Sequence, residues 1–587
     1  MSSPRDAAAA RPGLPQSFRA ADAEVAAAAL EGATKGLRRA DQSRQILRQW
    51  LDSFDGLLAS DGLELRFDRA PTAKKGDLVL SELAVKEGSP LVRTLRAFPR
   101  PAWPQEVPAG PVRSAIAEPL GPRLLLPWVE VERDELEVRI LDELDKTVAR
   151  LVWVKARARG VPCAAFSKVA EEQELPGRIE VHAIKGFEGA ARRLELRLEA
   201  QGLEPSPHDE RSLALAAVGL PLAAVSGGPL SFDEQEPAGR ALRRLLLAQR
   251  AVVEANEPGV RQRLDIEFLH DFRVAVRRSR SALSQLKGLL PEALAATLRR
   301  ELKWLGGITG PARDLDVYQD KLPAYGKRLP ATDAAGLQGL QGFLAELRDQ
   351  EQERLVAALD SERYRALMEV WGSLEAVDDE APESPAAARE AIGPRVCGRI
   401  RKLLRRVLRD GRAIRPETPA EAVHDLRIEC KKLRYSMELF RTLFDPRQLT
   451  SFIKQLKRLQ DNLGDFNDYE VQQVQLRTMA HQMSPQASSE GQGEDASAVD
   501  TYLALGRLMA FLDRAQQRER QRFHQRFEAF DQPPVRAAAE RLFGSLGSAV
   551  SSAQPLKKTA KKASKKSVKK KAKKSPEKGR RKAKGKG

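Results

Sequence analysis

Cysteine, aromatic residues and long hydrophobic runs are all scarce in this chain of 587 residues. The three cysteines, Cys163, Cys397 and Cys430, are too widely spaced for a disulfide framework or a structural zinc site, which fits a reducing compartment. One uncharged run, 212–232, is interrupted by Pro221 and Pro229, so we interpret it as a buried helix end followed by a linker and expect no membrane association. The first residues lack an apolar core and predict no signal peptide.

Positive charge is abundant but unevenly distributed. The net charge is +18, yet residues 557–587 alone hold 17 Lys and Arg against one Glu. This Lys-rich tail predicts a disordered segment that binds polyanions without sequence specificity, because it cannot bury a core and has no aromatic side chain to stack on bases. The rest of the chain is nearly neutral, so an anion site there requires basic side chains gathered on one surface.

Hydrophobic periodicity changes near residue 235. Before it, short alternating runs such as 45–53, 178–184 and 194–198 predict the strands of an antiparallel, β-rich domain. After it, apolar residues recur at helical spacing over long stretches, which predicts an all-α domain and an α+β multidomain chain. The predicted divisions are a disordered start (1–15), a β-rich domain (16–210), a linker (211–234), a helical domain (235–548) and a disordered Lys-rich tail (549–587).

The helical region contains an internal repeat. His270-Asp-Phe-Arg273 returns 154 residues later as His424-Asp-Leu-Arg427, and the offset holds without a gap as far as Asp314 and Asp468. The matches are mostly polar and basic, so duplication explains them better than a shared apolar stripe. The repeated helices are expected around 262–328 and 418–482.

On a helix at 100° per residue, each histidine shares one narrow stripe with the basic residues three, seven and ten positions later. Like charges this close repel one another unless an anion fills the stripe, and both Arg and Lys suit phosphate. Basic residues of the following segment could face each stripe across a groove. The candidate anion-binding residues are His270, Arg273, Arg277, Arg280, Arg300 and Lys303 in the first repeat, and His424, Arg427, Lys431, Lys432, Arg434, Lys454 and Lys457 in the second.

These two His-x-x-Arg-x-x-x-[Arg/Lys]-[Arg/Lys]-x-Arg helices, with the later segments Lys303-Trp-Leu and Lys457-Arg-Leu, resemble the CHAD family, the conserved-histidine α-helical domain. The similarity covers about residues 235–545. It implies two pseudo-symmetric four-helix bundles with a basic groove lined by those histidines, arginines and lysines. It also implies binding of inorganic polyphosphate and association with polyphosphate granules.

Residues 16–210 resemble a degenerate CYTH domain, the triphosphate-tunnel fold. Trp50-Leu-Asp-Ser-Phe-Asp-Gly and Gly62-Leu-Glu-Leu-Arg66 are similar to that family's Tyr-Phe-Asp-Thr and Gly-Leu-x-Leu-Arg segments. The family's first strand carries Glu-x-Glu-x-Lys, which holds metal and triphosphate, whereas this chain has Gln16-Ser-Phe-Arg-Ala20. Without metal ligands a phosphoanhydride hydrolase lacks its main stabiliser of transition-state charge, so we predict no metal, no cofactor and no enzyme activity.

Plainer explanations stay open for several residues. Each histidine could be a helix cap or a packing residue, while zinc binding or acid–base catalysis has no accompanying ligand set or nucleophile. The basic groups at 240–244 and 399–406 could extend the groove or only solubilise their helices.

The sequence therefore predicts non-catalytic binding of inorganic polyphosphate, in the cytoplasm and at polyphosphate granules. The alternative is a nucleoid- or RNA-associated protein that binds DNA or RNA through the Lys-rich tail. A phosphate-ester or phosphoanhydride hydrolase in the first domain is the third hypothesis.

Overall fold

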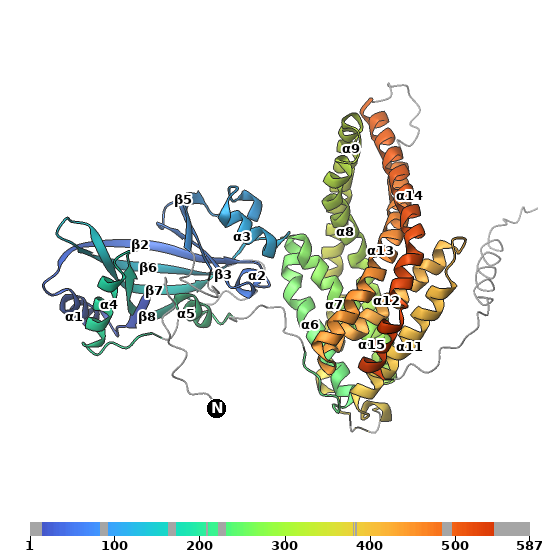
Figure 1. Cartoon of the computed structure of the whole chain (residues 1–587), viewed down its shortest axis with the longest axis horizontal. Coiled ribbons are helices and arrows are strands. Elements are labelled where there is room, and N and C mark those ends of the chain that lie inside the picture. Colours follow the sequence, from blue (N-terminus) through green and yellow to red (C-terminus); the bar gives the residue numbers. More distant parts are fainter. Residues whose placement is uncertain are drawn as a thin grey trace, which may run out of the picture.

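The computed structural model describes residues 15–82, 92–161, 172–206, 209–220, 230–379, 381, 384–483 and 496–544. A sheet domain is followed along the chain by a helical domain, and the two lie beside one another (Figure 1). This confirms the predicted α+β architecture. The segments predicted to be disordered, 1–15 and 549–587, lie outside the described residues except for residue 15.

An eight-stranded antiparallel sheet forms the described part of the first domain, in the order β1-β8-β7-β6-β2-β3-β4-β5. The first strand of the chain therefore pairs with the last, at one edge of the sheet. The strands are β1 (Gln16–Arg19), β2 (Arg38–Asp52), β3 (Leu63–Arg69), β4 (Lys75–Glu82), β5 (Val92–Pro99), β6 (Leu126–Leu141), β7 (Thr147–Gly160) and β8 (Gln173–Ala183). The helices are α1 (Ala23–Thr34), α2 (Leu57–Ser60), α3 (Pro111–Leu120), α4 (Glu188–Glu199) and α5 (Glu210–Ala217), with the 3₁₀ helix η2 (Pro104–Glu106).

Different helices cover the two faces of this sheet, because side chains alternate along each strand. Leu151 of β7 and Val181 of β8 belong to a core that includes α1 and α4. Val152, the neighbour of Leu151, belongs instead to a core that includes Ala214 and Leu215 of α5. Helix α5 therefore packs on the face opposite α1 and α4.

The segment 194–198, predicted as a strand, belongs to helix α4. Leu194 and Leu198 are four residues apart and buried, whereas Leu196 between them is 49% exposed. Alternation of Leu with polar residues therefore concealed a helical spacing of four. The strands predicted at 45–53 and 178–184 are confirmed as parts of β2 and β8.

The predicted linker, 211–234, contains most of helix α5. Asp209 caps this helix by accepting a hydrogen bond from the Ser212 backbone N–H at 2.7 Å. The helix end expected within the uncharged run is thus present, but it belongs to the first domain. The boundary between domains falls after residue 217.

The helical domain repeats one order of helices. The first half contains α6 (Ala238–Gln262), α7 (Ile266–Gln285), α8 (Glu292–Gly326), α9 (Ala331–Asp360) and α10 (Glu362–Gly372), and the second half contains α11 (Ile392–Ala413), α12 (Ala420–Leu439), α13 (Pro446–Met483), α14 (Ala496–Phe530) and α15 (Pro533–Phe543). Short 3₁₀ helices lie at η3 (Ser373–Ala376), η4 (Ala386–Ala388) and η5 (Arg441–Leu443). Each half thus has five α-helices among the described residues, where the resemblance implied four. Helices α8, α9, α13 and α14 extend beyond the others (Figure 1).

The two domains share a continuous hydrophobic core. Phe54, which follows β2, stacks in a tilted geometry on Phe268 of α7 with ring centres 4.9 Å apart. The guanidinium carbon of Arg123, which precedes β6, lies 5.7 Å from the centre of the same Phe268 ring. The first domain therefore packs on the first turn of α7. In the described chain, every helix is too short or too polar to cross a bilayer.

Candidate functional site: the basic seam

Helices α7 and α12 begin the two repeats, and both are amphipathic. The apolar faces predicted for them are buried, with Phe272 and Val276 of α7 and Cys430 and Leu433 of α12 at most 1% exposed. Asp265 caps α7, because its carboxylate accepts hydrogen bonds from the backbone N–H groups of the first turn. With one face fixed in the core, the stripe of each helix is held at a defined orientation.

Each histidine is held by the next long helix of its own half. The Nη2 of Arg313 on α8 donates to Nδ1 of His270 at 3.1 Å, and Asn467 on α13 contacts Nδ1 of His424. Both partners lie 43 residues after their histidine. Because arginine only donates, His270 is neutral in this contact, and burial lowers its pKa from the ordinary value.

The arginines that follow the histidines also contact these long helices. The Nη1 of Arg273 donates to Oγ1 of Thr309 at 2.9 Å and to the carbonyl oxygen of Gly306 at 3.2 Å. In the second repeat, Arg427 forms an ion pair of 3.1 Å with Asp468. Burial lowers the pKa of Arg273. Both guanidinium groups are thus anchored before any anion binds.

Tyr435 joins the two stripes. This residue of α12 is buried, and the guanidinium carbon of Arg277 on α7 lies 5.5 Å from the centre of its ring. The guanidinium carbon of Arg434 on α12 itself lies 5.3 Å from the same centre. Cation–π contacts on one ring therefore hold arginines of both repeats together. We call the cationic set of these two helices the basic seam: Arg273, Arg277, Arg280, Arg427, Lys431 and Arg434.

The cations of the basic seam repel one another, and this repulsion affects the pKa of Lys431. Burial, together with the neighbouring Arg427 and Arg277, lowers the pKa of Lys431 to about 8. Within the described part of the chain, no ion pair joins Arg277, Arg280 or Lys431 to a carboxylate, whereas Arg434 lies 3.6 Å from Glu438. The basic seam therefore carries positive charge that the described residues do not neutralise.

A glycine makes room for Arg280. A Cβ at Gly306 of α8 would lie 2.8 Å from Nη1 of Arg280, which is tighter than side chains normally pack. A Cβ at Gly310, one turn later, would lie 3.5 Å from Nη1 of Arg273, an ordinary contact. The small residues of α8 thus let α7 extend its arginines across the neighbouring helix.

Arg300 and Lys432, two further predicted residues, also have acidic partners. Arg300 pairs with Glu301 at 2.6 Å, and Glu301 also pairs with Arg363 of α10. Lys432 pairs with Glu429 at 2.6 Å. Their charge is partly balanced within the protein, as that of Arg427 is by Asp468.

Lys303, Lys454 and Lys457 are exposed. No hydrogen bond, ion pair or ring contact joins them to the basic seam within the described residues. Their place across a groove from the stripes therefore stays a prediction, as do the anion-binding roles of all the candidate residues.

Sequence reasoning missed Tyr435, Arg313 and Asn467. The 154-residue offset matches Arg313 with Asn467, but the two residue types differ, so the comparison of repeats did not select them. Tyr435 matches Ser281 and marks a departure from the repeat. Positions at which the two repeats carry different residue types could have pointed to these three residues.

The basic groups beside the repeats have different surroundings. Arg243 pairs with Asp379, and Arg244 with Glu236 at 2.7 Å, so this group is largely neutralised. Arg399 of α11 instead donates to Oε1 of Gln285, at the end of α7, at 2.6 Å. Arg399 of the second group therefore contacts α7, which carries one of the two stripes.

The described residues contain no group of three or more His, Cys, Asp or Glu side chains arranged to hold a metal ion. The basic seam also lacks a nucleophile with an adjacent base. Its chemistry is that of an anion site, in which guanidinium and ammonium groups bind oxyanions by charge and hydrogen bonding.

Parts of this chain are similar to known proteins. The family model described as CHAD domain matches residues 244–477. Two uncharacterized proteins of Mycobacterium tuberculosis, from strains CDC 1551 and H37Rv, are each 29% identical over 266 residues, which cover 42% of this chain and 46% of the relative. This chain thus spans about half the length of the curated relatives it matches.

Two solved structures are also similar. The CHAD domain from the plant Ricinus communis is 26% identical with a TM-score of 0.41, covering 51% of this chain and 95% of that one. PptA from Streptomyces chartreusis is 20% identical with a TM-score of 0.38, covering 50% and 100%. With the repeated histidine helices in place, residues 244–477 of this chain are a CHAD domain, and the preceding antiparallel sheet is consistent with a CYTH-like fold.

Proposed function

We propose that the CHAD domain binds inorganic polyphosphate along the basic seam, without catalysing a reaction. The observation that carries the proposal is the contact of Arg277 and Arg434 with one tyrosine ring, which makes a single cationic surface of the two repeats. A flexible chain of phosphates offers an oxyanion at every unit and relieves the repulsion among these side chains.

Polyphosphate suits this surface better than nucleic acid does. Proteins that bind single-stranded nucleic acid stack its bases on accessible aromatic rings. Tyr435 is only 9% exposed, and its ring is already in contact with Arg277 and Arg434. The basic seam therefore offers charge without a stacking platform. Association with polyphosphate granules in the cytoplasm is part of this proposal.

Charge reversal at four positions of the basic seam tests the proposal. In a chain shortened to residues 1–556, which keeps every described residue, Arg273, Arg277, Arg427 and Lys431 are replaced together by Glu. We expect affinity for long-chain polyphosphate to fall by at least about 100-fold, because four attractive contacts become repulsive. Wild-type binding should also weaken steeply with added salt.

A matched control reverses four arginines elsewhere. Arg38, Arg192, Arg354 and Arg522 each have more than half of their side chain exposed. Replacing them by Glu changes the net charge equally and should leave the affinity within a few-fold of wild type. Unchanged binding by the seam variant, or an equal loss in the control, would show that the seam assignment is wrong.

Nucleic-acid binding through the Lys-rich tail is the second candidate, favoured by the 17 Lys and Arg of residues 557–587. Competition separates the two functions. Long-chain polyphosphate should displace DNA from the chain shortened to residues 1–556, and DNA should not displace polyphosphate. Equal competition by both polymers would favour the nucleic-acid function and a location at the nucleoid.

A further inference from the structure

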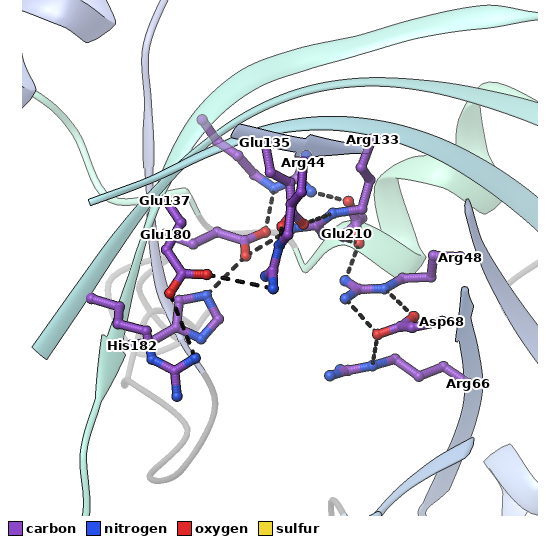
Figure 2. Close-up of polar contacts among 12 residues, drawn as sticks. Arg44, Arg48, Arg66, Asp68, Arg133, Glu135, Glu137, Glu180, His182 and Glu210 are labelled. Atoms are coloured by element: carbon purple, nitrogen blue, oxygen red, sulfur yellow. Dashed lines mark hydrogen bonds and ion pairs between the residues drawn. The ribbon is translucent and has the colours of Figure 1, made fainter. Parts of the chain in front are cut away.

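Three arginines of the first domain converge on one carboxylate. Glu210 lies in the first turn of α5. Its carboxylate accepts hydrogen bonds from Nη1 of Arg48 on β2 at 2.6 Å and from Nη1 of Arg133 on β6 at 2.5 Å (Figure 2). The Nη2 of Arg178 on β8 donates to the other oxygen of the same carboxylate. All four side chains are buried or nearly so, with 11% exposure for Arg48 and at most 7% for the others.

These arginines lie on the face of the sheet that α5 covers. Arg178 alternates along β8 with Ile179, which belongs to the core on the opposite face. In the sheet, β7 separates β8 from β6, and β6 pairs with β2. Guanidinium groups from three strands therefore meet at one point, although no two of them are neighbours in sequence. Such convergence is typical of a site for an oxyanion with several oxygens.

Three carboxylates next to these arginines also contact a guanidinium group. Glu180 pairs with Arg133 and Arg178, each at 3.0 Å. Glu135 pairs with Arg133 and Arg44 at 2.6 Å. Asp68 pairs with Arg48 at 2.7 Å (Figure 2).

A divalent cation does not fit this arrangement. The carboxylates of Glu210, Glu180, Glu135 and Asp68 each lie against a guanidinium group, which would repel Mg²⁺ or Mn²⁺. Strand β1 has the sequence Gln-Ser-Phe-Arg and contributes no carboxylate. The metal-bound triphosphate implied by the CYTH resemblance therefore has no ligand set here.

Glu210 does not satisfy all the donors around it. Arg178 is 2% exposed, and its Nη1 atom is buried without a hydrogen-bond partner. A carboxylate has two oxygens, whereas a phosphate or sulfate has more acceptors directed to different sides. Burial opposes the charge of Glu210, but the three arginines outweigh it and lower its pKa to about 2. The carboxylate is thus always ionised under physiological conditions.

We propose that Glu210 is an internal ligand: its carboxylate occupies an arginine site that would otherwise take a small oxyanion such as phosphate, and α5 thereby closes the first domain to phosphate compounds. The occupant comes from a helix rather than from a strand, so its removal leaves the strands and their arginines in place. This inference concerns the first domain and does not depend on polyphosphate binding by the basic seam.

Replacing Glu210 by Ala in the full chain tests the proposal, with inorganic phosphate as the probe. We expect E210A to gain one saturable phosphate site at least about tenfold tighter than any site of wild type, and phosphate to raise its melting temperature. A matched control, E188A, removes an exposed carboxylate from the first turn of α4 and should behave as wild type. The double variant E210A/R178A should lose the new site, which separates it from phosphate bound at the basic seam or the tail.

Two further measurements keep the proposal falsifiable. If E210A folds poorly, formate or phosphate should restore its folding as a replacement anion, and failure of both would show that Glu210 is only a structural partner. The variant E210Q keeps the size of the side chain and, when folded, should also gain stabilisation by phosphate. The proposal is wrong if folded E210A or E210Q gains no phosphate binding. It is also wrong if the single substitution R178A abolishes the binding of tripolyphosphate by the otherwise wild-type chain.

Discussion

At the residue scale, the members of the basic seam differ in how firmly they are held. Arg427 is paired with Asp468, and Arg273 is bound to α8, so both are anchored. Lys431 has neither kind of partner, and its ammonium group is repelled by Arg427 and Arg277. An anchored arginine contributes a fixed hydrogen-bonding geometry, whereas Lys431 contributes a charge that depends on pH.

Polyphosphate affinity should fall as the pH rises from 7 to 9, because the pKa of Lys431 lies at about 8. In K431R this fall should be smaller by roughly fivefold, since arginine keeps its charge and one such contact is worth about 1 kcal/mol. Titrations of both proteins with the same long-chain polyphosphate at several pH values measure the difference. Identical pH profiles would mean that Lys431 does not contact the anion.

The unliganded protein should show the opposite trend in stability. Between about 8 and the ordinary value of 10.5, the unfolded chain binds a proton at Lys431 and the folded chain does not. The free energy of unfolding should therefore rise with pH in this window, relative to K431R. Denaturant unfolding at pH 7.5 and pH 9.5 checks the sign.

At the element scale, close approach of helices depends on glycine. A Cβ at Gly259 of α6 would overlap the ring of Phe268 on α7, and a Cβ at Gly411 of α11 would overlap the ring of Phe527 on α14. Both glycines lie near the C-terminal end of the first helix of their half. These contacts set how near α7 and α14 lie to their neighbours.

G259A should lower the free energy of unfolding by about 1–3 kcal/mol, because the Phe268 ring must move within a close-packed core. The matched control is G307A on α8, where no atom lies within 4 Å of the added methyl group. There alanine should stabilise the helix by about 0.5–1 kcal/mol. Equal effects of the two substitutions in denaturant unfolding would contradict the packing argument.

At the scale of the whole molecule, Arg123 links the two domains. It comes from the sheet domain, is 5% exposed, and pairs with Asp55 at 3.1 Å, with Asp265 at 3.6 Å and with Asp271 beside His270. Asp425, the counterpart of Asp271 in the second repeat, is exposed. Among the residues that the structure describes, the first domain therefore neutralises acidic charge next to one half of the CHAD domain and not the other, which breaks the symmetry of the repeat.

R123A should destabilise the protein by about 2–4 kcal/mol, because it leaves carboxylates of both domains without their buried partner. Arg38, paired with Asp145 on the surface of the same domain, provides the control, and R38A should change stability by less than about 0.5 kcal/mol. Chemical denaturation of both variants measures the difference. An R123A protein as stable as R38A would show that the link contributes nothing.

Local sequence determined much of this protein, because the geometry of a helix is set by its own residues. The positions of the cationic stripes, their apolar faces and the repeat that relates Arg273 to Arg427 all follow from spacing along the chain. The β-rich domain was also predicted, although alternation alone could not separate a strand from the helix at 194–198.

Only the tertiary structure decided which of these groups meet. Arg277 and Tyr435 come from different halves of the CHAD domain, and Glu210 lies 162 residues after Arg48. The sequence shows Arg178 and Glu180 as an alternating strand pattern but does not show that a later helix supplies the carboxylate between the arginines. Contacts between distant segments depend on how cores pack and which faces they cover, and spacing along the chain carries no information about that.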